Sequence, residues 1–479
     1  MIKLRPYQTN TTEAVKKSFA SGHRNTILCA PTGSGKTVMF SDIILKAAKR
    51  STRCLVLTDR LELFKQTLGS LVRVNISVQE LNAKTRLKDF DPLAIVTLGM
   101  VETIKRRKLT DYDPQLIIID EAHKGNFSKV IEQYPNARII GATATPVGKH
   151  IPKYYTDIVS IIDIPELIDN GFLSPCRPYQ MQDDFSDLKT NRGEYTDSSL
   201  FEHFAKKNLY AGVIENWKKY AENKKTIVFN VNIEHTEQMH TEFKAAGIHS
   251  EFLTSNTTTE ERNRILKAFK DGLFPVLNNC GILTTGYDEP SIECVIMNRK
   301  TKSLPLWLQC CGRGSRIFPG KTEFVVLDFG RNHDEHGLWA EPRDWKLEQP
   351  KKKKKLQAAP VKDCPKCAAM VAASARVCAF CGHLFSETKK TLEEGVMVEV
   401  KSIVPEELIG VQMDVCTVDQ LIKLQQVKRF SAAFIWRVVR SNGAEAVRDY
   451  AKKMNYKQGW VKRQLDDLEN SEFQNIILR

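Results

Sequence analysis

The sequence predicts an α/β fold with two tandem domains, each a parallel sheet with flanking helices, followed by two small C-terminal modules. Short β-branched apolar runs alternate with amphipathic segments over about the first 165 residues, and the alternation returns between residues 226 and 327. Strands that alternate with helices in this way form parallel sheets covered on both faces. Four paired cysteines and a basic helical tail predict the two modules that follow.

The first domain is expected to span residues 1–170 and the second residues 171–340. The strands expected in the first domain are 26–29, 54–57, 94–96, 116–119 and 138–140. Those expected in the second are 226–229, 275–277, 293–296 and 324–327. Residues 174–208 contain Pro175, Pro178 and a polar stretch, which indicates a connector rather than core. We therefore expect the cleft between the domains at this join.

The composition is that of a soluble globular protein. The chain has 479 residues, of which 42% are hydrophobic and 27% charged, and at about 150 residues per domain this length favours roughly three domains. No apolar stretch is long enough to span a bilayer, so we expect a cytoplasmic protein without a membrane partner. The formal charge of +14 favours a polyanionic partner, although it also fits solubility alone.

The segment Ala30–Thr37, here called the phosphate loop, has the sequence APTGSGKT between an apolar strand and a helical stretch. That context is the one a phosphate-binding loop requires. Gly33, Ser34 and Gly35 allow backbone N–H groups to face the phosphates, Lys36 reaches the β- and γ-phosphates, and the Thr37 hydroxyl is suited to Mg²⁺. Ala30 replaces the first glycine of the general pattern. The alternative is a glycine-rich turn before a helix.

Two carboxylates follow the buried run 116–119 at the carboxyl edge of the predicted sheet, where ligands of such folds bind. Asp120 is expected to hold Mg²⁺, and Glu121 to orient or deprotonate an attacking water. Acidic residues after a strand are also common without a function. A histidine at this place, here His123, is more often structural.

Arg313 and Arg316 of the second domain lie in a glycine-containing segment, GRGSR. Their spacing favours a helix start from which both project toward one anion, where they stabilise the charge on a transferring phosphoryl group. The alternative is a pair of surface arginines in a basic protein. The order of loop, carboxylates and arginines predicts an enzyme that hydrolyses ATP.

The same residues resemble the motif series of superfamily 2 helicases of the DEAD/DEAH-box type, over roughly the first 330 residues. The resemblance implies two RecA-like domains that clamp ATP. Leu4–Gln8 resembles the segment in which the glutamine, here Gln8, reads the adenine edge, and Arg5 is expected beside the nucleotide. The segments Leu283–Asp288 and Phe229–Val231 resemble the fifth and fourth motifs, and the former implies that Gly286 and Asp288 lie near nucleotide and strand.

Other matches imply contacts with nucleic acid or coupling to its movement. The segments 57–60 and 97–98 resemble first-domain motifs that touch the nucleic-acid backbone, and 143–145 resembles the motif that couples hydrolysis to strand movement. The residues implied in contacts are Arg60, Thr97, Thr143, Thr145, Thr284 and Thr285. In isolation each of these segments fits a structural loop.

Within the superfamily the chain is similar to the RadD-type group of bacterial DNA-repair helicases. Glu166–Leu173, with the sequence ELIDNGFL, carries the similarity, together with cysteine pairs after the motor. The tail is shorter than expected for this group, and Tyr456–Trp460 resembles phage forms.

The cysteine module is expected to be a zinc ribbon over residues 361–388, behind a basic linker at residues 341–360. Its ligands are Cys364, Cys367, Cys378 and Cys381, in two CxxC pairs separated by ten residues. Four thiolates complete a tetrahedral Zn²⁺ site, so the metal is expected to be structural. Unpaired thiols and iron–sulfur ligation are the alternatives.

The last module, residues 395–479, is expected to be helical and basic. Residues 417–463 contain eleven Lys or Arg against three Asp or Glu, a net +8. Interleaved Trp436, Tyr456 and Trp460 favour a surface that contacts phosphates and stacks bases, with a solvated helical face as the alternative.

Together these features predict an ATP-dependent DNA helicase or translocase that acts in repair, recombination or replication. The expected cofactors are ATP, Mg²⁺ and Zn²⁺, and the expected partner is single-stranded or forked DNA, with single-strand-binding or recombination proteins as further partners. The alternatives are an ATPase that remodels RNA or nucleoprotein, and a nucleic-acid-binding ATPase subunit of a recombination or restriction complex.

Overall fold

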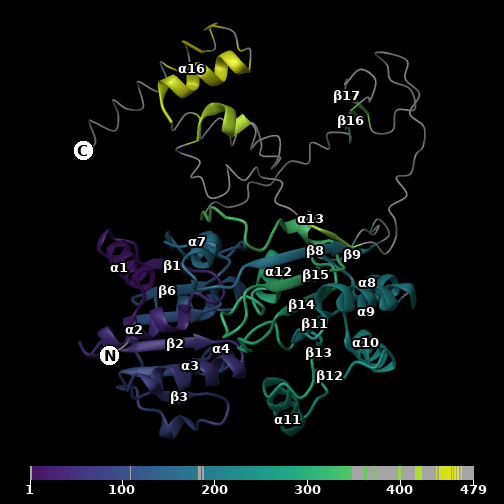
Figure 1. The fold of residues 1–479 in the computed structure, drawn as a ribbon. Coiled ribbons are helices and arrows are strands. Elements are labelled where there is room, and N and C mark those ends of the chain that lie inside the picture. Colours follow the sequence, from purple (N-terminus) through teal and green to yellow (C-terminus); the bar gives the residue numbers. More distant parts are fainter. Residues whose placement is uncertain are drawn as a thin grey trace. The chain divides into compact units, whose positions relative to one another are not determined.

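Parallel strands organise the first 347 residues of the computed structural model (Figure 1). The structure describes residues 3–347 except 108, 110, 182–184, 186, 187, 192 and 206, and later residues 361–363, 370–372, 397–400, 416–422, 439, 442–454, 456, 458, 459, 461, 462 and 465. Residues 1–399 form one compact unit and residues 400–479 another.

The first domain is a seven-stranded parallel sheet with the strand order β3-β4-β2-β5-β6-β1-β7. Its strands are β1 (Asn25–Cys29), β2 (Cys54–Thr58), β3 (Gln79–Leu81), β4 (Val96–Met100), β5 (Leu116–Asp120), β6 (Arg138–Thr143) and β7 (Asp157–Ser160). Its helices are α1 (Pro6–Ala20), α2 (Lys36–Ala48), α3 (Leu61–Arg73), α4 (Val101–Arg106), α5 (Ser128–Gln133) and α6 (Ile151–Tyr154), with short 3-10 turns at Leu87–Asp89 and Ala122–Lys124.

Alternation along the strands places a core on each face of this sheet. Leu28, Val56 and Ile118 pack with apolar residues of α1, α2 and α3. Their neighbours Ile27 and Ile117 face the other side, where α4, α5 and α6 cover them. Four of the five predicted strands match β1, β2, β5 and β6, whereas the strand expected at 94–96 is β4, which begins only at Val96 and leaves Ile95 exposed. The strand interiors are buried, as expected for a parallel sheet covered on both faces.

The second domain is also seven-stranded, with the order β12-β13-β11-β14-β15-β8-β18, and only β18 runs antiparallel. Its strands are β8 (Cys176–Met181), β11 (Thr226–Asn230), β12 (Ser250–Leu253), β13 (Val276–Asn279), β14 (Cys294–Asn298), β15 (Phe324–Asp328) and β18 (Met397–Glu399). Its helices are α8 (Asp197–Phe204), α9 (Lys207–Ala221), α10 (Ile233–Ala245), α11 (Thr259–Lys270), α12 (Leu304–Cys311) and α13 (Asn332–His336), and a small hairpin pairs β9 (Thr190–Asn191) with β10 (Glu194–Tyr195).

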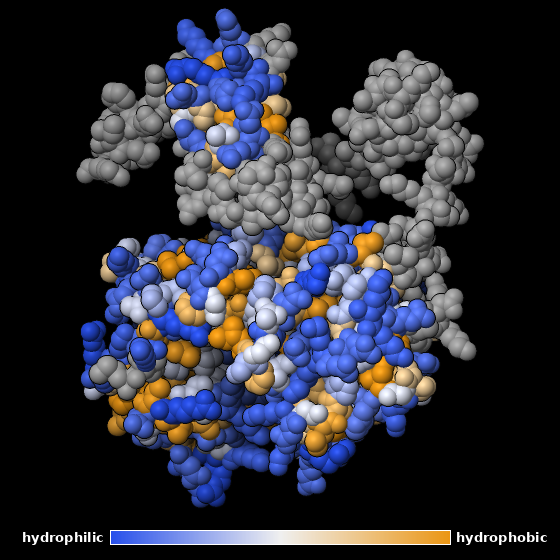
Figure 2. Space-filling model, in the orientation of Figure 1, coloured by the Kyte–Doolittle hydropathy of each residue, from blue (hydrophilic) through white to orange (hydrophobic). Residues whose placement is uncertain are grey.

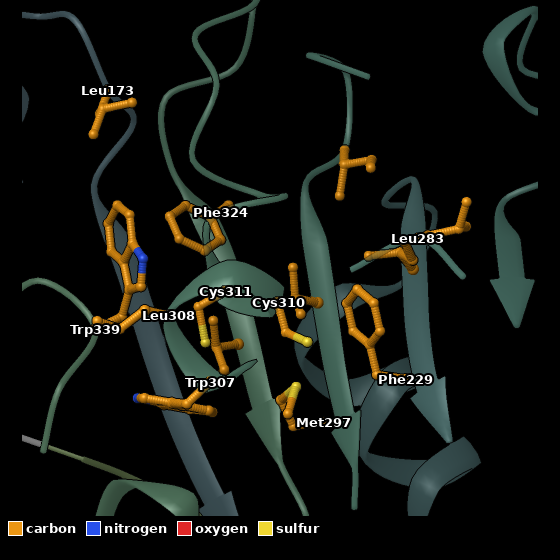
Figure 3. Packing of buried hydrophobic residues seen from close by; sticks show 14 of the residues in the cluster. Leu173, Phe229, Leu283, Met297, Trp307, Leu308, Cys310, Cys311, Phe324 and Trp339 are labelled. Atoms are coloured by element: carbon orange, nitrogen blue, oxygen red, sulfur yellow. The ribbon is translucent and has the colours of Figure 1, made fainter. Parts of the chain in front are cut away.

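Figure 3 shows the core on one face of this second sheet. Trp307, Cys310 and Cys311 of α12 pack there with Phe324 of β15 and with Trp339. α7 (Ile164–Asp169), which lies before the predicted boundary at residue 170, contributes Ile164 and Leu167 to the same core. None of the eight cysteines in the described residues forms a disulfide.

Two expectations about connectors were wrong. Cys176–Met181 is strand β8 and pairs with β15, although Pro178 had indicated a connector. Proline is tolerated because only the short β18 pairs with β8 on its other side. The start of the linker expected at residues 341–360 is not free, since Trp345 packs against apolar clusters of both domains.

The last unit contains α16 (Ala444–Lys453), whose Val447, Tyr450 and Ala451 are buried. An antiparallel hairpin, β16 (Val361–Asp363) with β17 (Met370–Ala372), lies earlier in the chain, within the first unit. The four predicted zinc ligands lie outside the described residues. Within the described part of the chain, every helix is too short or too polar to span a bilayer. Figure 2 shows a mainly hydrophilic surface on the α/β unit, with small hydrophobic patches.

Candidate active site

The phosphate loop connects β1 to α2 at the carboxyl edge of the first sheet. Gly33 and Gly35 have left-handed φ angles of +94° and +82°, which glycine adopts without a steric penalty. The Lys36 ammonium donates hydrogen bonds to the carbonyl oxygens of Ala30 (3.2 Å) and Pro31 (3.4 Å). Burial lowers the pKa of Lys36, and the charges of Glu121 and Asp120 oppose that shift. The loop thus places the Lys36 ammonium where the phosphate groups of a nucleotide would lie.

Asp120 and Glu121 face this cation from the end of β5. The Asp120 carboxylate accepts a 3.0 Å hydrogen bond from the Glu121 N–H. Burial, followed by the neighbouring charge of Glu121, raises the pKa of Asp120 to about 7. Such a group is suited to a cation, because a bound metal removes the penalty on its charged form.

Glu121 is held ionised. Burial disfavours its charge, but the hydrogen bond from His123, together with the charges of Lys36, His123 and Lys124, outweighs burial and lowers the pKa of Glu121 to about 2. The His123 Nδ1 atom lies 3.2 Å from Glu121 Oε2 and 3.0 Å from Thr143 Oγ1. Glu121 also has a left-handed φ of +53°, rare for a residue with a side chain. His123 therefore orients Glu121, a role that the sequence left as structural.

The N-terminal segment contacts the phosphate loop through Ser34. Its carbonyl oxygen accepts hydrogen bonds from Gln8 Nε2 (2.9 Å) and from the Tyr7 hydroxyl (2.7 Å). The Arg5 guanidinium lies 4.2 Å above the Phe172 ring, which also contacts Tyr7. Arg5 and Gln8 are thus brought beside the loop, and Phe172 joins them without having been predicted.

Arg316 reaches the phosphate loop from the second domain. A Cβ atom built on Gly33 would lie 2.2 Å from Arg316 Nη1. The Arg316 Nε atom donates to Asp288 Oδ1 at 3.0 Å, whereas Nη1 is buried without a hydrogen-bond partner. One face of the guanidinium is therefore held by a carboxylate, and the other N–H group is directed at the loop.

Arg313 is placed differently from the prediction that both arginines project toward one anion. Its guanidinium donates to the carbonyl oxygens of Tyr287 and, at 2.7 Å, of Thr284. Burial, followed by the charge of Arg316, lowers the pKa of Arg313 to about 10. The motif ends α12 in a tight turn, so the two side chains leave it in different directions.

Further contacts join the domains around this site. Gln309 Nε2 lies 3.5 Å from Glu121 Oε2, at the limit of a hydrogen bond, and no role was predicted for Gln309 from the sequence. A Cβ on Gly286 would lie 3.1 Å from Glu62 Cβ. Glu62 also pairs with Arg262 of α11 at 3.1 Å.

Three residues predicted to contact nucleic acid are not accessible to it in this structure. Thr97, Thr143 and Thr145 are fully buried, because they lie within β4 or at the end of β6 rather than in exposed loops. Thr143 instead bonds His123 and the backbone of Thr145. Arg60 is half-buried at the start of α3, and Thr284 and Thr285 are 6% and 5% exposed.

Among the described residues, no group of three or more His, Cys, Asp or Glu side chains is arranged to hold a metal ion. That statement does not extend to Cys364, Cys367, Cys378 and Cys381, which lie outside the described residues. Zn²⁺ therefore stays a prediction from spacing alone.

Two family models match the chain. The model described as type III restriction enzyme, res subunit, matches residues 1–148, and the helicase conserved C-terminal domain matches residues 206–318. A 51.5 kDa protein of a Lactococcus phage is 31% identical over 371 residues, covering 75% of this chain and 78% of the phage protein. The chain belongs to the superfamily 2 helicases.

Other relatives agree with this family. A Saccharomyces cerevisiae protein named as ATP-dependent helicase IRC3 is 30% identical to this helicase over 68% of the chain, which spans 51% of the yeast protein. The solved structure of the ATP-dependent type ISP restriction-modification enzyme LlaBIII, bound to DNA, has a TM-score of 0.53 and 17% identity, covering 68% of this chain and 27% of that enzyme. The helicase is thus an ATP-hydrolysing enzyme with two RecA-like domains.

Proposed function

We propose that this helicase couples ATP hydrolysis at the cleft between its two domains to movement along DNA. The observation that carries the proposal is Arg316, whose unpartnered Nη1 atom lies against Gly33 of the opposite domain. An arginine supplied across a cleft stabilises the charge of a transferring phosphoryl group only when the cleft is closed. Closure and hydrolysis are thereby linked.

The remaining roles follow from the geometry. Lys36 and the N–H groups of residues 33–37 bind the phosphates, and Gln8 with Arg5 borders the base. Asp120 and the Thr37 hydroxyl fit a Mg²⁺ ion, which supplies charge neutralisation on the phosphates when bound. Glu121, ionised and oriented by His123, holds and deprotonates the attacking water. Arg313 braces the loop that contains Thr284 and Tyr287.

DNA is the proposed track for two reasons. The chain carries a formal charge of +14, with a net +8 in residues 417–463. LlaBIII, which shares the fold, was solved with DNA. The second candidate function is that of an ATPase subunit of a restriction assembly, which is favoured by the restriction-enzyme family model that matches residues 1–148. RNA remodelling is the other alternative.

We also propose a RadD-like relationship and a structural zinc ribbon behind the motor. In the sequence, the first cysteine pair, Cys364 and Cys367, falls between the antiparallel strands β16 and β17. Metal analysis of the full chain tests this directly. One zinc per chain, lost in Cys364→Ser, supports the ribbon, and no bound zinc in either protein refutes it.

Replacement of Arg316 tests the catalytic proposal. Arg316→Ala should lower the DNA-stimulated kcat by about 10³-fold or more, while ATP still binds through the phosphate loop. Arg264→Ala is the matched control, because Arg264 is an exposed arginine of the same domain whose side chain pairs only with Glu261. Turnover in Arg316→Ala close to that of the control would refute the proposed role.

A further inference from the structure

Lys321 is a partly buried lysine outside the nucleotide motifs. Its ammonium has three N–H groups and lies within hydrogen-bond distance of four backbone carbonyl oxygens, those of Pro290, Ile292, Gly314 and Arg316, so two of these contacts share one N–H group. The distance to the Arg316 oxygen is 2.8 Å and that to the Pro290 oxygen 3.3 Å. A lysine that leaves water must recover its hydrogen bonds inside the protein, and all four of these partners are main-chain carbonyl groups.

The four carbonyl groups belong to two segments that both serve Arg316. Gly314 and Arg316 are in the turn after α12, so two of the bonds fix the backbone of Arg316 itself. Pro290 and Ile292 follow Asp288, the carboxylate that accepts from the Arg316 side chain. Lys321 therefore ties the backbone of the arginine to the segment that orients its guanidinium.

Ser174 holds the same backbone from another direction. Its N–H donates to the Ser315 carbonyl at 2.8 Å, and its hydroxyl donates to the Arg316 carbonyl at 3.0 Å. The preceding residue, Leu173, lies against Gly33, since a Cβ on Gly33 would be 2.7 Å from its Cδ2 atom. One carbonyl oxygen, that of Arg316, is thus shared by a lysine and by a serine that adjoins the phosphate loop.

We propose that Lys321 and Ser174 are positioning residues that aim Arg316 at the phosphate loop. The inference rests on the proposed role of Arg316 and adds the residues through which its position is fixed. Without Lys321 the turn keeps Arg313 but loses the one cation among the described residues that bonds the Arg316 carbonyl group, and the carbonyl groups of the two segments lose a shared donor. A displacement of about 1 Å at a group that must meet the transition state costs about 10²-fold in rate.

Two variants test the proposal, with Lys244→Met as control because Lys244 is exposed in the same domain. Lys321→Met should lower the DNA-stimulated kcat by about 10- to 100-fold and leave KM for ATP within about threefold. Ser174→Ala, which removes only one hydroxyl, should show a smaller loss of the same kind. The second readout is affinity for ADP with aluminium fluoride, which mimics the transferring phosphoryl group, compared with affinity for ADP alone.

Positioning predicts that both variants lose affinity for the aluminium fluoride complex but not for ADP, whereas general damage to the fold lowers both. The inference would be overturned if Lys321→Met and Ser174→Ala kept a normal kcat and a normal affinity for the aluminium fluoride complex while Arg316→Ala lost turnover and that affinity. The proposed role of Arg316 would then stand. Normal turnover in Arg316→Ala as well would refute the proposed function itself. If Lys321→Met does not fold, Ser174→Ala decides alone.

Discussion

Arg316 of the second domain lies so close to Gly33 of the first that a methyl group on Gly33 would come within 2.2 Å of the arginine Nη1 atom. A contact this close joins the loop that binds the phosphates to the residue proposed to stabilise their transfer. A side chain at Gly33 would therefore have to displace the end of the Arg316 side chain from the phosphate loop, and it would also strain the loop conformation.

Gly33→Ala should abolish ATP turnover. The added methyl group meets Arg316 and Leu173, and it also requires a φ of +94° that alanine adopts at a cost of about 1 kcal/mol. Gly22→Ala is a matched control, because Gly22 has a φ of +92° and nothing within 4 Å of its Cβ position. Steady-state ATP hydrolysis should be lost in the first variant and kept in the second. Equal activity in both would mean that the cleft does not close as described.

Glu121→Gln should lower kcat by about 10²- to 10⁴-fold, because the amide cannot accept a proton from water. ATP binding should persist, since the phosphate loop is unchanged, and DNA binding should persist too. Glu237→Gln, an exposed change in α10, is the control. Retained turnover in Glu121→Gln would remove Glu121 from the chemistry. Lys36→Ala should likewise abolish hydrolysis without abolishing DNA binding.

The value of kcat should fall at alkaline pH because Lys321 loses its proton. Burial lowers the pKa of Lys321 to about 8, with Glu293 opposing the shift and Arg316 and Lys224 adding to it. The lysine is therefore protonated below pH 8 and loses one of its three N–H donors as the pH rises through 8. We expect the DNA-stimulated kcat to decline between about pH 8 and pH 9. The Lys321→Met variant, whose kcat is already lower, should not show this decline. The same decline in that variant would assign it to another group.

Trp339→Ala should destabilise the motor by about 3–5 kcal/mol. The Trp339 side chain is 2% exposed and packs edge-on against Phe324, with ring centroids 5.3 Å apart. Thermal unfolding followed by circular dichroism should show a midpoint several degrees lower than in Leu273→Ala, whose leucine is 66% exposed. An unchanged midpoint would show that residues after α13 add little to the core.

The central strands and the nucleotide residues could be predicted because each depends on local pattern. Apolar runs such as 116–119 identify buried strands directly, and the phosphate loop has a fixed spacing. β8 could not be predicted, because Pro178 and a mixed polar sequence hide a strand that its partner β15 stabilises. The packing of Trp345 could not be predicted, because its partners lie in other elements.

The site shows the same limit. Asp120, Glu121 and Arg316 follow from motifs, whereas Lys321 has no motif and is recognised only by four carbonyl groups that the fold brings together. The burial of Thr97 was equally invisible, since a threonine in a strand and one in a loop read alike. The different orientation of Arg313 depends on the turn after α12, which spacing does not define.

The most direct test of the central claim is steady-state ATP hydrolysis by the full chain alone, with single-stranded DNA, with forked duplex DNA and with RNA, at one fixed salt concentration. A DNA-driven motor predicts strong stimulation by DNA and little by RNA. Equal stimulation by both, or stimulation by neither, would contradict a DNA motor and favour an RNA remodeller or an ATPase subunit that requires its partner.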